Sequence, residues 1–183
     1  MTTESIEFIA YDFILHHDLV YPIDMRDILS HFSPCTLLTF EEAASQFGMP
    51  MNKFRCLTGT ADAFTANQGG HYLVFYDDNK PNSRINFSLA HELGHILLGH
   101  FDGQTPYRIE READRFAITL ICPLPVVYVK QLRSQMDVYN IFKLSIESSN
   151  YRWFAFYAWK RSRGFSYIEK LCINTYSQML NQS

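Results

Sequence analysis

The sequence predicts an α+β fold in which short strands and a long central helix are followed by further helices. Apolar residues recur at helical spacing in several stretches, and two short segments rich in β-formers stand between them. Everything after Pro125 has a helical pattern. Hydrophobic residues make up 47% and charged residues 19% of the 183 residues, which is typical of a globular chain with one domain, or one domain and a small appendage.

The N-terminal elements follow from periodicity and from residues that begin or end helices. Apolar side chains at helical spacing predict an amphipathic helix over residues 4–17, and MRDILSHF (25–32) predicts a short second one. CTLLTF is strand-like. In the following TFEEAASQFG, Thr39 and Glu42 have the spacing of a capping box, which predicts a helix over 40–47. We expect the stretch 49–70 to be irregular, because it is rich in turn residues.

The central part of the chain alternates a strand with two helices. HYLVFYDD (71–78) is dense in β-formers and is bounded by Gly-Gly and by Asn-Lys-Pro-Asn, so it predicts a strand. A helix is expected from Ser83 to about His100, followed by a loop with Gly and Pro. A second helix is expected from Arg108 to Cys122, because prolines follow it. Three more helices are expected over VVYVKQLRSQ, DVYNIFKL and ESSNYRWFAFYAWKR.

Charge is distributed unevenly along the chain. Residues 1–125 carry 8 Lys+Arg against 16 Asp+Glu, a net of −8, and residues 126–183 carry 8 against 3, a net of +5. We therefore expect one domain over 1–125 and a separate helical segment over 126–183. The four cysteines form no CxxC pair, the N-terminus has no basic region typical of a signal peptide, and no apolar run reaches membrane-spanning length. These features predict a cytoplasmic protein with reduced thiols and no membrane association.

The stretch HELGHILLGH contains a candidate metal site. Positions i and i+4 of a helix lie on one face, so His91 and His95 project two imidazoles side by side, at the reach of one tetrahedral Zn²⁺. Glu92 is rotated off that face, where a general base for a zinc-activated water must stand. The helix is otherwise apolar nearly all round, and a metal accounts for three polar groups in one window. The alternative is a satisfied histidine pair on a solvent face. His100 is expected to be a C-cap or surface imidazole.

A catalytic zinc needs a third protein ligand. The metzincin pattern HExxHxxGxxH is excluded, because the glycine stands four residues after His95 and no histidine follows at the required place. The next helix, EREADRFAITLICP, offers Glu110 and Glu112. Glu110 shares a face with Asp114, so one carboxylate can bind the metal while the other orients a ligand histidine. Glu112 lies on another face and is expected to be a solvent-exposed charge. Spacing favours Glu110 and leaves Glu112 open.

At this point the motifs resemble a known family. RINFSLAHELGHILLGH followed by EREADRFAITLICP is similar to the ImmA/IrrE family of bacterial metallopeptidases, most strongly over residues 71–123. The family pattern is Glu-x-x-x-Asn/Asp-x-x-Ala with a proline thirteen residues after the Glu. These positions are Glu110, Asp114, Ala117 and Pro123, so the resemblance implies that Glu110 is the third ligand. The chain departs from the family in reading Ile-Cys-Pro where Leu-Met-Pro is more usual.

The resemblance also implies a fold and an activity. It implies a zincin-like, gluzincin-like core with a small mixed sheet and an active-site helix, and a C-terminal segment resembling a helix-turn-helix. In such a core the 71–78 strand lies over the metal with an exposed edge for an extended substrate. The implied activity is that of a zinc-dependent, site-specific endopeptidase. Its protein substrate would be a helix-turn-helix repressor of a phage, another mobile element or a stress regulon. Mn²⁺ also suits the same ligands.

Two alternative hypotheses concern the metal site and the C-terminal segment. One is a catalytically silent regulator, or a toxin–antitoxin component, with a structural metal site and a C-terminal segment that binds protein or DNA. YRWFAFYAW carries six aromatic residues near basic ones, a composition that suits stacking on nucleic acid. Packing against the core is the favoured reading, and DNA binding is unsupported because few basic residues lie on the helix-turn-helix-like segment. Residues 161–183 match no known pattern.

Overall fold

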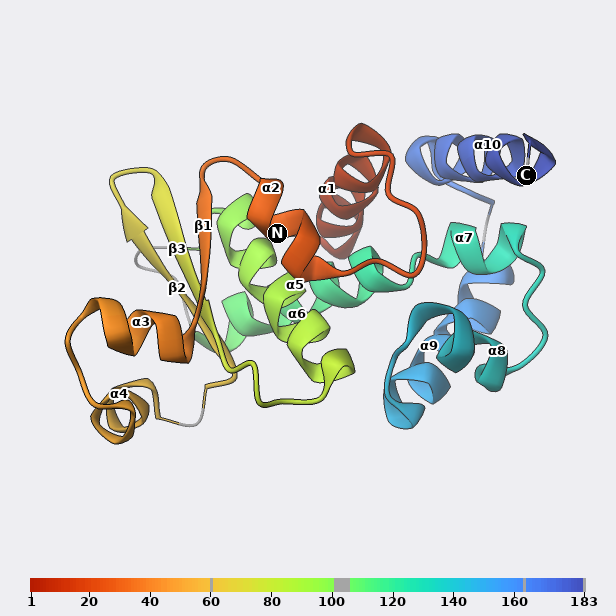
Figure 1. The fold of residues 1–183 in the computed structure, drawn as a ribbon. Helices are drawn as coiled ribbons and strands as arrows, with labels where there is room; N and C mark the ends of the chain where they lie inside the picture. The colour runs from red at the N-terminus through yellow and green to blue at the C-terminus, as the bar shows by residue number, and fades with distance from the viewer. Residues whose placement is uncertain (60, 101–105, 163, 183) are drawn as a thin grey trace. The chain divides into compact units, whose positions relative to one another are not determined.

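The computed structural model describes residues 1–59, 61–100, 106–162 and 164–182 (Figure 1). They form two compact units, which we call the sheet unit (24–113) and the helical unit (1–23 with 114–183). In chain order the elements are α1 Thr3–His16, α2 Met25–His31, β1 Cys35–Thr39, α3 Phe40–Gln46, α4 Met51–Thr58, β2 Ala63–Gln68, β3 His71–Tyr76, α5 Asn82–Leu98, α6 Pro106–Ile121, α7 Leu124–Val129, α8 Gln135–Phe142, α9 Ile146–Lys160 and α10 Tyr167–Gln182. The predicted α+β class with a small mixed sheet is confirmed, whereas the domain boundary near Pro125 stays a prediction.

The sheet has three strands in the order β1-β3-β2. β1 pairs parallel with β3, and β2 pairs antiparallel with it, in a register that places Thr65 opposite Val74. Because β3 is central, both of its edges are hydrogen-bonded, so the expectation that this strand offers an exposed edge is wrong. Among the described strands, β1 and β2 form the edges. β2 is therefore the strand beside α5 that can accept another strand.

Side-chain alternation along the strands gives the sheet two different faces. One face packs against α3 and α4 in an aromatic cluster made by Phe40, Phe54, Phe64 and Phe75. Because successive strand residues point to opposite faces, Thr65 points away from this cluster and towards α5. In Figure 1, α3 and α4 lie on one side of the sheet and α5 on the other. The aromatic face thus anchors the strands, while the opposite face meets the helix that carries HELGH.

The expectation of an irregular stretch over 49–70 is wrong, because this stretch contains α4 and β2. α4 is short, and its one buried side chain, Phe54, belongs to the aromatic cluster. β2 leads into β3 through Gly69 and Gly70, both with positive φ, 63° and 95°. A two-residue turn with positive φ at both positions matches the twist of a hairpin, and glycine adopts it without steric cost. Turn residues therefore marked a hairpin here and not a long loop.

The ends of α5 and the capping of α3 agree with the sequence. The Thr39 and Glu42 capping box is present at the start of α3. α5 begins after Pro81 and ends before Gly99, whose φ of 70° is left-handed. The backbone N–H of His100 then donates to the carbonyl of His95 at 3.0 Å, as in a Schellman motif. The loop expected between α5 and α6 falls largely on residues 101–105, outside the described residues.

The helical unit is built from α1, part of α6, and α7 to α10. α1 and α7 both pack on α10, and α8 packs on α9. Buried polar groups join its segments: the Tyr21 hydroxyl donates to the Leu120 carbonyl at 2.7 Å, and Arg152 Nε donates to the Cys122 carbonyl at 2.6 Å. α10 covers much of the stretch that matched no pattern, and α7 ends at Val129, earlier than expected.

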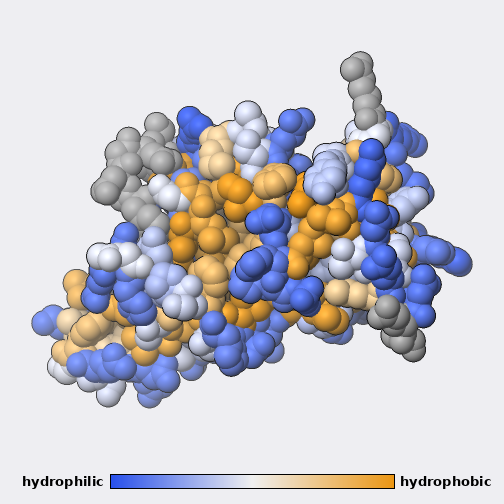
Figure 2. Space-filling model, turned by 90° about the horizontal axis from the view of Figure 1, so that it is seen from above, coloured by the Kyte–Doolittle hydropathy of each residue, from blue (hydrophilic) through white to orange (hydrophobic). Residues whose placement is uncertain are grey.

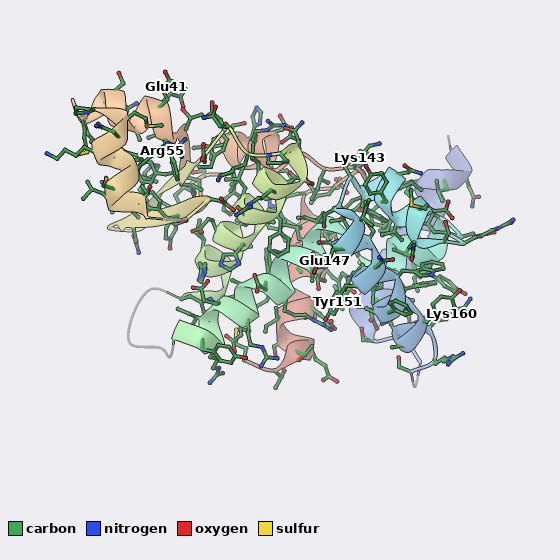
Figure 3. All side chains as sticks on the ribbon, turned by 90° about the horizontal axis from the view of Figure 1, so that it is seen from below. Glu41, Arg55, Lys143, Glu147, Tyr151 and Lys160 are labelled. Carbon is green, nitrogen blue, oxygen red and sulfur yellow. The ribbon has the colours of Figure 1, made fainter. Side chains whose placement is uncertain are left out.

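The aromatic residues of α9 contact one another and their neighbours in the helical unit. Trp153 stacks on Phe156 with ring centroids 5.6 Å apart, and Trp159 stacks on Phe165 at 4.6 Å. These contacts favour the packing interpretation of this helix, although Tyr151, labelled in Figure 3, is exposed. Figure 2 shows hydrophobic residues reaching the surface among hydrophilic ones. Among the described residues, no helix has both the length and the apolar character needed to cross a bilayer.

Candidate metal centre

His91 and His95 lie one turn apart on α5, as their spacing predicts. Their Nε2 atoms approach to 2.9 Å, and their side chains are only 15% and 12% exposed. The apolar remainder of α5 explains this placement, since Leu89 and Leu93 are fully buried and fix the rotation of the helix. Two imidazole nitrogens therefore face the same point from a rigid element.

Glu110, near the start of α6, completes the group. Its Oε2 lies 3.2 Å from His91 Nε2, and its Oε1 lies 3.5 Å from His95 Nε2. One ligand atom from each of the three residues lies within 4.8 Å of the others. Three electron-pair donors converging on one point fit a cation between them, and two histidines with one glutamate form a donor set known from catalytic zinc sites, which keep a fourth position open. The Glu110 side chain is 57% exposed, so the group is accessible from solvent.

Glu92 lies beside this group but is not part of it. It is buried, and its Oε2 accepts a hydrogen bond from the Thr65 hydroxyl at 2.7 Å. Burial raises the pKa of the Glu92 carboxyl, an effect that the Thr65 hydrogen bond and the charge of His91 oppose and that the charge of Glu110 reinforces. A carboxylate with a raised pKa is a stronger base than a surface carboxylate, which suits proton transfer.

Thr65 is a site residue that sequence reasoning missed. It belongs to β2, in the stretch expected to be irregular. The available signal was the pair Gly69-Gly70 between two runs of β-formers, which is typical of a hairpin. Recognising that hairpin would have placed every second residue of β2 on the same face, and with it Thr65 towards α5.

His100 is not a surface imidazole, as the sequence suggested, but is buried with 7% of its area exposed. Its Nδ1 lies 3.2 Å from Nδ1 of His95, and its Nε2 lies 3.0 Å from Oε2 of Glu112. Glu112 is likewise not an exposed helix charge, because only 7% of it is exposed and its Oε1 accepts from Arg108 Nε at 2.9 Å. The expectations of a surface imidazole and of an exposed carboxylate were wrong, because the turn after α5 brings the His100 ring between His95 and Glu112. The alternative expectation for His100, a C-cap, agrees with the bond from its backbone N–H to the His95 carbonyl.

Asp114, on α6 four residues after Glu110, is exposed. Its role in orienting a ligand histidine stays a prediction. By contrast, the contact of His95 with His100 is present in the structure.

Comparison with known proteins agrees with the geometry. Residues 44–154 match the family model described as the IrrE N-terminal-like domain, peptidase family M78. The matched stretch contains β2, β3, α5 and α6, and therefore every residue described above at the metal centre. A search of curated proteins found no significant match to the chain.

Proposed function

The chain belongs to the ImmA/IrrE family of metallo-endopeptidases, and on this premise we propose that His91, His95 and Glu110 hold a catalytic Zn²⁺ with which the protein hydrolyses peptide bonds. The family is zinc-dependent, and its membership confirms the resemblance seen in the sequence. The observation that carries the proposal for this chain is the convergence of the two Nε2 atoms and the Glu110 carboxylate. Mn²⁺ remains an alternative occupant, because the same ligand types accept it.

When bound, the metal supplies a Lewis acid that polarises the scissile carbonyl and lowers the pKa of water. Glu92 takes the proton from the attacking water and then delivers it to the nitrogen of the leaving amine as the C–N bond breaks. The Thr65 hydroxyl engages one carboxylate oxygen of Glu92, which fixes the carboxylate and leaves its second oxygen for the water. Asp114 orients a ligand histidine in this proposal.

The substrate is an extended segment that adds to the free edge of β2. Backbone N–H and C=O groups along an edge strand are a template for another strand. β2 is an edge strand that packs against α5, and its Thr65 contacts Glu92. A strand added beside β2 therefore runs close to the base. Cleavage then requires unstructured or locally unfolded backbone.

The family resemblance points to a helix-turn-helix transcriptional repressor as the protein substrate, whose cleavage relieves repression of a mobile element or a stress regulon. The net charge of −8 over residues 1–125 is complementary to a basic, DNA-binding substrate and would raise the rate of encounter. The helix-turn-helix-like segment within residues 126–183 is assigned to recognition of that repressor. The rings of Trp153, Phe156 and Trp159 pack within the helical unit, which disfavours a role for them in stacking on nucleic acid.

The experiment that tests the proposal is Glu92→Gln, assayed for cleavage of a helix-turn-helix repressor that is co-expressed with it and cleaved by the wild type. We expect this variant to bind zinc like the wild type and to leave the repressor intact, because the amide cannot accept the proton. Glu41→Gln on α3, exposed and labelled in Figure 3, is the matched control and should cleave normally. Full cleavage by Glu92→Gln would refute the role of the base, and a wild-type protein that takes up neither zinc nor manganese would refute the metal site.

A further inference from the structure

A chain of hydrogen bonds leads away from the metal centre on the side of His95 that does not face the other ligands. Nε2 of His95 faces His91 and Glu110, whereas Nδ1 lies 3.2 Å from Nδ1 of His100. The chain continues from His100 Nε2 to Glu112 Oε2 at 3.0 Å and ends where Glu112 Oε1 accepts from Arg108 Nε at 2.9 Å. Neither His100 nor Glu112 belongs to the group of ligand atoms.

Burial makes these contacts consequential. The His100 side chain is 1% exposed and the Glu112 side chain 9% exposed. A buried polar group without a partner costs free energy, so the ring nitrogens and carboxylate oxygens here are expected to keep these hydrogen bonds. The Arg108 side chain, 63% exposed, holds Glu112 from the solvent side. The series of hydrogen bonds therefore ends at the solvent side with the permanently charged guanidinium of Arg108.

The directions of the bonds follow from the ligand atom. If Nε2 of His95 is the ligand, Nδ1 carries the proton and donates to Nδ1 of His100. His100 must then carry its own proton on Nε2, which donates to the Glu112 carboxylate. Every donor meets an acceptor, and only one tautomer of each imidazole satisfies the chain.

Local structure explains how His100 reaches this place. Gly99 takes the left-handed conformation that ends α5, and the backbone N–H of His100 bonds to the carbonyl of His95 at 3.0 Å. The backbone of His100 thus caps the helix without help from its side chain. The ring is left free for a second task, and it contacts the ring of the same residue, His95, with centroids 5.2 Å apart.

We propose that His100 and Glu112 are positioning residues that fix the orientation and tautomer of the ligand His95, with Arg108 holding the carboxylate in place. The inference rests on the proposed function, because it assigns His95 to the metal. Hydrogen-bonded partners of this kind change metal affinity by about 10- to 100-fold in other metal sites. In this proposal Glu112 does not bind the metal but hydrogen-bonds to His100, which in turn orients the ligand His95.

Zinc affinity, measured by competition with a chromogenic chelator, tests the proposal. His100→Ala and Glu112→Ala should each weaken zinc binding about 10- to 100-fold, and Arg108→Ala by less, since Arg108 is at the exposed end. Because the residues act in series, the double variant His100→Ala/Glu112→Ala should lose little more than the weaker-binding single variant. His31→Ala, which removes an exposed histidine of the sheet unit, should bind like the wild type. Zinc affinity within twofold of wild type in both single variants would overturn the proposal.

A second measurement needs no substitution and covers the case in which His100→Ala fails to fold. NMR correlations between ring nitrogens and carbon-bound ring protons in the zinc-loaded wild type report the tautomer of each histidine. We expect the proton of His95 on Nδ1 and that of His100 on Nε2. The opposite tautomer of His100 would contradict the proposed series of hydrogen bonds from His95 to Glu112. A wild-type protein that takes up no metal would remove the proposed function and this inference together, whereas normal metal binding with the wrong tautomer would remove the inference alone.

Discussion

Two polar clusters of the sheet unit differ in how their charges are balanced. The first, which we call the Asp77 cluster, joins α4, the strand ends and the start of α5 through Arg55, Asp62, Asp77, Lys80 and Arg84. Arg55, labelled in Figure 3, donates two hydrogen bonds to the buried Asp77 carboxylate at 2.9 and 3.0 Å. Lys80 lies between Asp62 at 3.4 Å and Asp77 at 3.7 Å. In this cluster the protein supplies the cation for each carboxylate.

The metal centre is arranged in the opposite way. Nε2 of His91, Nε2 of His95 and the carboxylate of Glu110 point at one another, although all three are ligand atoms that share a preference for a cation. No described Lys or Arg side chain is paired with Glu110 in the structure. The Asp77 cluster is closed by its own counter-charges and can hold the fold without a ligand, whereas the converging ligand atoms of the candidate metal centre would be balanced by the proposed ion.

The largest expected effect is on metal uptake. Glu110→Ala removes a ligand, so the loss of zinc affinity should exceed the roughly 10- to 100-fold typical of losing a residue that hydrogen-bonds to a ligand. Asp77→Asn should bind zinc like the wild type, because its cluster is closed without a metal. Both are measured by chelator competition. Equal zinc affinity in Glu110→Ala and wild type would remove the distinction between the two clusters.

The reverse holds for stability. Asp77→Asn should lower the free energy of unfolding by about 2 kcal/mol at neutral pH, because charged hydrogen bonds are lost in a buried position. The pKa of Asp77 is lowered from 3.8 to about 2, mainly by the hydrogen bonds from Arg55, while burial acts in the opposite direction. A lowered folded-state pKa stabilises the protein above pH 4, and this contribution disappears as the pH falls towards 2. Urea unfolding of both proteins between pH 7 and pH 2 should show their difference shrinking over that window, and a constant difference would contradict the assignment.

A smaller effect is expected from the hydrogen bond that links β2 to the base. Thr65→Val keeps a β-branched side chain in the strand but removes the donor to Glu92. We expect kcat to fall about tenfold, the size of one hydrogen bond to a charged group, with KM little changed. Thr36→Val is the control, since that hydroxyl bonds His71 on the exposed part of the sheet. A raised KM with kcat unchanged would place Thr65 in substrate binding instead.

The smallest effect concerns the turn that places His100. Gly99→Ala meets no atom within 4 Å of the new Cβ, so its cost is the left-handed conformation alone, about 1 kcal/mol. Gly48→Ala, at a φ of 60° on another helix end, should cost the same. Only Gly99→Ala should also weaken zinc binding, because it shifts His100. Zinc affinity equal in the two variants would separate the turn from the metal centre.

Sequence by itself determined the features that depend on neighbours along one helix. His91 and His95 are four residues apart, and helical geometry alone puts them on one face. The capping box of Thr39 and Glu42 is likewise local. The family pattern added Glu110, because it encodes the spacing of a ligand that the helix period could not separate from Glu112.

Tertiary structure decided the features that join distant segments. Thr65 and Glu92 are 27 residues apart, and His100 and Glu112 are 12 apart, so no helical period relates them. The central position of β3, and with it the edge position of β2 among the described strands, came from strand pairing. A hydrogen bond between two elements depends on how they pack, and packing is set by the whole buried surface of the sheet unit, which no short stretch of sequence contains.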